Sequence, residues 1–330
     1  MPLRIARSKA RSAVRVLDAT CFAAWLTTSL GEAPAEPPWT GRPRMHQRTI
    51  AREVIVEGIG LHTGRPARLT LRPAPAGSGI VFRRVDLAGS PPVRASLASV
   101  GGTERGVILR SSVPVATVEH LLSAAYGLGI ENLVVDVEGE ELPAGDGSAL
   151  AYVGALRRAG TLELDAPRLR IVLEEAVWAR DETGCIVALP FPGLKVRYVV
   201  TLPELGAQMA TFDAGSDRFE EAIAPARTWG FVEEAEELRR RGLALGASEE
   251  NVLVLSQKGY VGAPRFPDEP ARHKILDLLG ALALLGGEVA GEFVAIGGGH
   301  ALHISLVRRI AERGRRSPAP LPGEGDQTGG

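Results

Sequence analysis

A succession of strand-like runs followed by helix-like runs occurs twice along the chain, and this pattern constrains the fold most strongly. In the first half, apolar alternation predicts strands between residues 48 and 85, and Thr117 is predicted to cap a helix that follows it. The second half repeats the mixture between residues 169 and 313, with a helical pattern at 233–241. Grouped strands followed by helices favour two α+β layers over a doubly wound sheet, so we predict the α+β class.

The expected domains are 46–165 and 166–313, with Pro167 near the boundary. In the second, the apolar-periodic run Ala271–Leu285 predicts the longest helix, and Ala301–Arg313 predicts the last. Residues 1–45 are interpreted as a flexible leader, or as sequence upstream of a true start at Met45, although a basic run before an apolar stretch imitates a signal peptide. Residues 314–330 are rich in proline and glycine near their end and predict a disordered tail.

Composition excludes several classes of function. The 38 Lys and Arg residues balance 39 Asp and Glu, so the chain lacks the positive charge of a dedicated nucleic-acid binder. The two cysteines, Cys21 and Cys185, are too few and too far apart for a disulfide framework or a thiolate zinc site. We therefore expect a reducing, cytoplasmic location. No run approaches the ~20 apolar residues that a membrane span needs. The nucleotide-binding motifs G-x-G-x-x-G after a strand and G-x-x-x-x-G-K-[ST] are both absent, which disfavours a nucleotide-cofactor fold.

The residues able to do chemistry lie on three predicted helices. His273 and Asp277 are four residues apart and face the same side of a helix. Such a pair is more often a simple hydrogen bond, but His120 on another helix can complete a zinc site of two histidines and one carboxylate. Glu119 would then face a water bound to the ion, unless it only stabilises the helix start. His300, after three glycines, is a candidate general acid, or an ordinary histidine at a helix start.

Six short strings resemble the UDP-3-O-acyl-N-acetylglucosamine deacetylases of lipid A synthesis, in the same order along residues 46 to 312. They are GIGLHTG at 58–64, TVEHL at 117–121, LPAGDGSA at 142–149, ARTWGF at 226–231, RHKILD at 272–277 and GHAL at 299–302.

The resemblance implies two similar two-layer α/β sandwich domains that face each other with a zinc site between them. It also implies one Zn²⁺ as cofactor. The roles that it assigns are zinc ligands for His120, His273 and Asp277, general base for Glu119, general acid for His300, and donor to the tetrahedral intermediate for Thr228.

The implied substrate is a UDP-linked acylated amino sugar. Its hydroxyacyl chain would pass along Trp229 and Phe231, which would otherwise be ordinary core aromatics. Lys274 and His62 are candidates for contacting the sugar or its phosphates. We expect no nucleic-acid partner, at most peripheral membrane contact through the acyl chain, and a monomer.

Three positions depart from the family pattern. Ala281 stands where the family usually has the aspartate that binds the acid histidine, and Gly297 stands where it usually has a lysine near the diphosphate. The stretch 199–204 lacks the aromatic and histidine side chains associated with the nucleotide end.

The leading hypothesis is zinc-dependent deacetylation of UDP-3-O-(hydroxyacyl)-N-acetylglucosamine to the free amine and acetate. The alternatives are a zinc amidohydrolase for a related acylated amino sugar and a non-catalytic homologue that binds a lipid-sugar.

Overall fold

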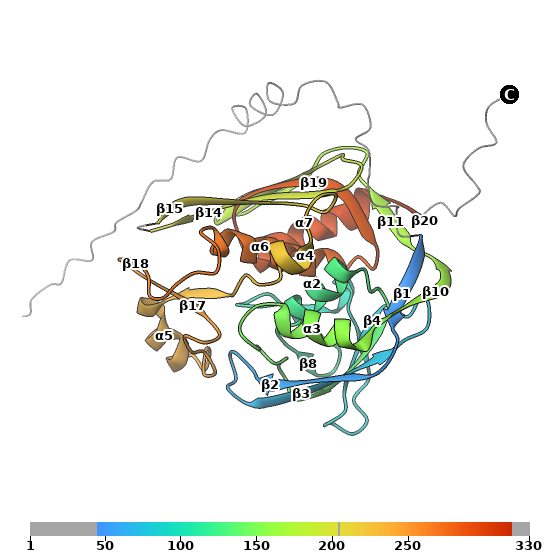
Figure 1. Ribbon diagram of the computed structural model, residues 1–330, viewed down its shortest axis with the longest axis horizontal. Helices are drawn as coiled ribbons and strands as arrows, with labels where there is room; N and C mark the ends of the chain where they lie inside the picture. The colour runs from blue at the N-terminus through green and yellow to red at the C-terminus, as the bar shows by residue number, and fades with distance from the viewer. Residues whose placement is uncertain (1–44, 204, 319–330) are drawn as a thin grey trace, which may run out of the picture. The chain divides into compact units, whose positions relative to one another are not determined.

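Two sheets enclose two layers of helices in the structure, a computed structural model that describes residues 45–203 and 205–318. From bottom to top, Figure 1 shows a first sheet, helices α2 (Glu119–Leu128) and α3 (Leu150–Ala159), helices α6 (Glu269–Ala283) and α7 (His300–Arg313), and a second sheet. The mixed α/β class expected from the sequence is confirmed. The division into domains 46–165 and 166–313 stays a prediction. Of the expected leader, residues 1–45, all but Met45 lie outside the described residues.

The first sheet has five strands in the order β2-β3-β9-β4-β5. All neighbours are antiparallel except β4 and β9, which run parallel. Buried residues alternate along its strands, as in Leu69 and Leu71, so one face is buried, and α3 contacts β2 and α2. The elements are β2 (Val54–Ile59), β3 (Pro66–Pro73), β4 (Ile80–Arg84), β5 (Val93–Arg94), β9 (Leu133–Glu138), α2 (Glu119–Leu128) and α3 (Leu150–Ala159).

The second sheet has seven strands, with β19 (Glu288–Gly297) at its centre between β13 (Gly184–Leu189) on one side and β11 (Leu169–Val172) and β14 (Leu194–Leu202) on the other. Its remaining strands are β12 (Val177–Arg180), β15 (Gly206–Asp213) and β20 (Arg315–Pro318). Helices α6 (Glu269–Ala283) and α7 (His300–Arg313) cover one face. Strand β20 pairs with β11 although its residues fall in the range expected to be a tail; residues 319–330 lie outside the described part.

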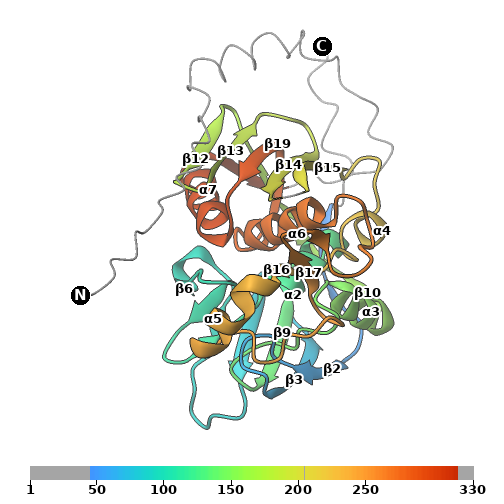
Figure 2. The same cartoon turned by 90° about the vertical axis from the view of Figure 1, so that its left-hand side faces the viewer.

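Three smaller ladders complete the fold. Strand β1 (His46–Ile50) pairs with β10 (Thr161–Pro167). One small sheet contains β6 (Val100–Gly102), β7 (Ile108–Arg110) and β8 (Pro114–Val115), and another contains β16 (Trp229–Phe231), β17 (Leu253–Ser256) and β18 (Gly259–Tyr260). The helical pattern expected at 233–241 is a 3-10 turn at Val232–Glu234 followed by α5 (Ala235–Arg240). Figure 2 shows α5 near β6, and Arg105 pairs with Glu234 at 2.9 Å.

Candidate active site

Helices α2 and α6 cross closely at one glycine. A Cβ at Gly280 would lie 2.4 Å from the main-chain oxygen of Glu119, a separation that no side chain tolerates. Gly280 therefore allows the start of α2 to approach the middle of α6. This crossing brings His120 of α2 to His273 and Asp277 of α6.

His120, His273 and Asp277 form the candidate metal site. All three are buried, and one ligand atom from each lies within 4.8 Å of the others. The rings of His120 and His273 meet edge to face, with centroids 5.1 Å apart. Two imidazoles and one carboxylate are the donor set of open catalytic zinc sites, which keep a position for water or substrate. The structure therefore brings together the three residues that the sequence predicts as ligands.

The chemistry of these donors fits a cation. Nδ1 of His273 lies 3.1 Å from the carbonyl oxygen of Ala226, and because a carbonyl only accepts, His273 carries its proton there. Its Nε2 lone pair then faces Oδ1 of Asp277 at 3.4 Å. That carboxylate oxygen is buried and has no hydrogen-bond donor among the described residues. Two acceptors that face each other in a buried site need a positive ion between them.

Protonation states also suit metal binding. Burial and the neighbouring His273 lower the pKa of His120 to about 3, so its imidazole is neutral at pH 7. Burial opposes ionisation of Asp277, but Lys274 and the surrounding histidines outweigh it and hold the pKa of that carboxyl well below its usual range. Nζ of Lys274 donates to Oδ2 of Asp277 at 3.0 Å. Neutral imidazoles and an ionised carboxylate are the forms that ligate zinc.

Glu119 and His300 lie beside the three ligands. The main-chain N–H of Val107 donates to Oε2 of Glu119 at 2.8 Å, and the other oxygen, Oε1, lies 3.8 Å from Nε2 of His300. The same nitrogen lies 3.8 Å from Oδ2 of Asp277. Burial and the charge of Asp277 raise the pKa of Glu119 to about 8, and burial lowers the pKa of His300 to about 4. The pair therefore holds one proton near neutral pH.

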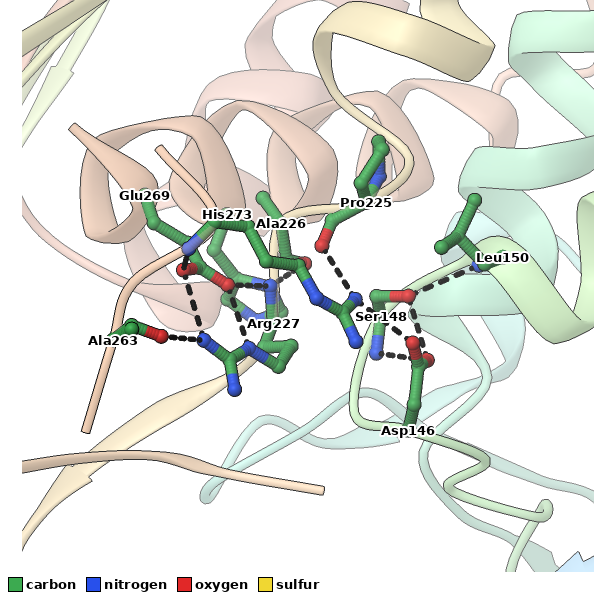
Figure 3. A network of polar contacts seen from close by, with 10 residues as sticks. Asp146, Ser148, Leu150, Pro225, Ala226, Arg227, Ala263, Glu269 and His273 are labelled. Carbon is green, nitrogen blue, oxygen red and sulfur yellow. Dashed lines mark hydrogen bonds and ion pairs between the residues drawn. The ribbon is translucent and has the colours of Figure 1, made fainter. Parts of the chain in front are cut away.

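A buried ion pair fixes the segment that supports His273, as Figure 3 shows. Glu269 is fully buried and accepts from the main-chain N–H and Nε of Arg227, both at 2.9 Å. Arg227 follows Ala226 directly, so this bond holds the carbonyl that orients His273. Arg265 extends the network: its main-chain N–H donates to Glu269, and its guanidinium pairs at 2.8 Å with Asp146, in the turn before α3.

A strained residue precedes α2. Thr117 has φ +59°, a left-handed conformation that is unfavourable for a β-branched residue. Its hydroxyl donates to buried Glu141 at 3.1 Å, and Glu141 also accepts from the main-chain N–H groups of His62 and Thr63. The prediction that Thr117 caps α2 is wrong: the N-cap residue is Val118, which makes no side-chain cap bond. The hydroxyl of Thr117 is used instead to hold the strained backbone next to Glu119.

The remaining residues that the sequence predicts for the site make contacts of several kinds. Lys274 stands 5.7 Å from the ring of Trp229, which meets Phe231 edge to face at 6.0 Å. Thr228 is half-buried, and its main chain bonds Gly147 and Leu253. Both ring nitrogens of His62 have partners: Nδ1 accepts from Ala244 and Nε2 donates to the carbonyl of Arg105. Substrate contacts by these residues stay predictions.

Two of the departures from the family pattern, Gly297 and Ala281, lie in the part of the chain that the structure describes. Gly297 has φ +66°, and a Cβ there would lie 2.4 Å from the carbonyl oxygen of Thr183, so this backbone excludes a lysine. Ala281 is buried in α6 and offers His300 no polar group.

Sequence reasoning missed Glu269 and Glu141, whose roles depend on contacts with residues 42 and 79 positions away in the sequence. It also missed His303, buried one turn after His300.

Fold and site together define a mixed α/β protein with a candidate catalytic metal centre. The family model described as LpxC, UDP-3-O-acyl N-acetylglycosamine deacetylase, matches residues 47–312. The chain is 40% identical over 271 residues to the UDP-3-O-acyl-N-acetylglucosamine deacetylase of Thermosynechococcus vestitus, covering 81% of this chain and 94% of the relative. It is 41% identical over 273 residues to the deacetylase of the same name from Pseudomonas entomophila, covering 81% and 90%.

The chain therefore belongs to the UDP-3-O-acyl-N-acetylglucosamine deacetylase family and is a deacetylase. Within residues 45–203 and 205–318, none of the helices has the length and apolar character needed to cross a membrane.

Proposed function

We propose that this chain hydrolyses the acetamide of UDP-3-O-(hydroxyacyl)-N-acetylglucosamine with one bound Zn²⁺, releasing acetate and the free amine in lipid A synthesis. The observation that carries the proposal is the buried set of His120, His273 and Asp277 with two acid–base groups beside it. A site that only binds a sugar has no use for two buried groups able to exchange a proton.

The residues divide the work of hydrolysis. His120, His273 and Asp277 would hold the ion, which when bound lowers the pKa of a water and polarises a carbonyl. The positive charge of the bound ion would lower the pKa of the Glu119 carboxyl and leave the one proton of the pair on His300. The Glu119 carboxylate then accepts the proton of the water that attacks the acetamide carbon. His300 donates a proton to the nitrogen as the carbon–nitrogen bond breaks, and the Thr228 hydroxyl donates to the developing oxyanion.

The substrate's acyl chain is assigned to the segment that contains β16 to β18. Trp229 and Phe231 are only half-buried there. The same segment exposes large apolar side chains, among them Val232 at 49%, Leu245 at 53% and Val261 at 40%. Exposed apolar side chains provide a surface for a hydrocarbon chain. Lys274 and His62 are proposed to contact the sugar or its phosphates. The cytoplasmic location and the monomeric state stay predictions.

The test combines metal analysis with product analysis. Purified protein is analysed for zinc by mass spectrometry and assayed for acetate release from the UDP-acyl-sugar and from simple N-acetyl sugars. We expect about one zinc per chain and acetate only from the UDP-acyl-sugar. Preference for another acylated amino sugar would favour the related amidohydrolase. Absence of both zinc and acetate would leave the lipid-sugar-binding homologue.

A further inference from the structure

A buried histidine that the proposed mechanism does not use lies behind His300. His303 is one turn further along α7 and faces the same side of that helix. The two rings meet edge to face with centroids 6.2 Å apart. His303 is fully buried and the His300 side chain is 13% exposed, and Nδ1 of each is buried without a hydrogen-bond partner among the described residues. A polar atom left unpaired in a protein interior needs an explanation.

The proton positions of His303 follow from its neighbour Tyr198. The hydroxyl of Tyr198 lies 2.9 Å from the carbonyl oxygen of Gly297 and 2.9 Å from Nε2 of His303. The carbonyl can only accept, so the single hydroxyl proton of Tyr198 is donated to Gly297. Tyr198 must therefore accept from His303, which carries its proton on Nε2. Nδ1 of His303 is left as an acceptor.

His300 needs such an acceptor. Its Nε2 faces Glu119 and Asp277, both at 3.8 Å, so the nitrogen used for chemistry is on the side of the metal site. Nδ1 lies on the opposite edge of the ring. Because Nε2 gains and loses its proton in the reaction, Nδ1 must carry the ring's second proton and donate it in a hydrogen bond. Two imidazoles joined by a direct hydrogen bond of ~3 Å have centroids about 5 Å apart, because each nitrogen lies about 1 Å from its ring centre. The centroids of His300 and His303 are 6.2 Å apart, and a single water can bridge the wider gap.

We propose that His303, oriented by Tyr198, is a positioning residue for His300 and accepts the hydrogen bond of the His300 Nδ1–H through one bridging water. This assignment rests on the proposed function, because it gives His300 a purpose only if Nε2 transfers a proton. It also explains how the ring can be held although residue 281 is alanine.

The chain offers a matched pair of substitutions. In His303→Asn the amide oxygen replaces the Nδ1 acceptor, whereas in His303→Gln the longer amide reaches the hydroxyl of Tyr198 and leaves no acceptor at the δ position. We expect His303→Asn to keep kcat within about threefold of wild type. We expect His303→Gln to lower kcat roughly 10- to 100-fold, the usual cost of removing an outer hydrogen-bond partner, with KM and zinc content unchanged. Tyr198→Phe should lower kcat by less than His303→Gln, since it only frees the His303 tautomer.

Equal kcat in the two His303 variants would overturn the proposal, and so would a loss that appears only in KM. Nitrogen-15 NMR of the wild-type imidazoles gives a test that needs no variant to fold. The proposal requires a protonated Nδ1 in His300 and an unprotonated Nδ1 in His303, and the reverse pattern would overturn it. Wild-type protein that releases no acetate would contradict the proposed function instead, while the NMR result still decides the hydrogen bond.

Discussion

The carbonyl oxygen of Ala226 accepts a hydrogen bond from Nδ1 of His273 at 3.1 Å, and this contact determines which nitrogen of His273 faces Asp277. The carbonyl precedes Arg227, whose ion pair with Glu269 is almost completely buried. The metal site is thus linked through one peptide unit to a buried charge pair. Outer partners of this kind orient metal ligands and affect metal affinity.

Replacing Glu269 by Gln should lower the free energy of unfolding at pH 7 by about 3 kcal/mol, since it leaves the guanidinium of Arg227 buried without its counter-charge. Burial opposes ionisation of Glu269, but bonds from Arg227 and Arg265 outweigh it and lower its pKa. The ionised pair therefore stabilises the fold above the unfolded pKa of ~4.3, and the contribution is lost as pH falls through the lower folded pKa.

The difference between wild type and Glu269→Gln should consequently shrink below about pH 4.5. Urea unfolding between pH 7 and pH 4 measures it. The control is Glu221→Gln, which removes an exposed ion pair with Arg218 and should cost less than ~0.5 kcal/mol. A pH-independent difference for Glu269→Gln would contradict the assignment.

Replacing Asp277 by Ala should remove most of the zinc at micromolar free metal, because affinity depends on the number of ligands. Metal content after dialysis measures this, with Asp165→Ala as a control at an exposed position. Zinc occupancy equal to wild type would show that Asp277 is not a ligand.

The variant Glu119→Gln should retain zinc and the bond from Val107, because the amide oxygen can still accept. It should lower kcat by about 10³, within the range for loss of a general base. Steady-state kinetics of acetate release test this prediction. Activity within threefold of wild type would rule out Glu119 as the base.

Gly280→Ala tests the close crossing of α2 and α6. The new methyl group would meet the main-chain oxygen of Glu119 at 2.4 Å, so we expect a loss of about 1–3 kcal/mol in stability and weaker zinc binding. Gly154→Ala in α3 is the matched control: its Cβ would meet only Nη1 of Arg158 at 3.4 Å, so better helix propensity should leave stability equal or higher. Equal behaviour of the two variants would contradict the role of Gly280.

Local patterns predicted the elements that carry the site, and long-range contacts determined what the sequence could not predict. The helix expected at 271–285 is α6, and its ligand spacing is visible in the sequence because helical periodicity is local. Thr117 resembled a helix cap, yet its conformation depends on Glu141, which is 24 residues away. The pairing of β20 with β11 likewise joins residues 169–172 to 315–318, which no local pattern reveals.

Zinc titration of the metal-free enzyme tests the central claim most directly. Chelator-treated protein should release no acetate from UDP-3-O-(hydroxyacyl)-N-acetylglucosamine, and activity should rise linearly with added Zn²⁺ to a maximum at about one equivalent per chain, the capacity of a single site of His120, His273 and Asp277. Full acetate release by the chelated protein, or none at any zinc concentration, would contradict the account.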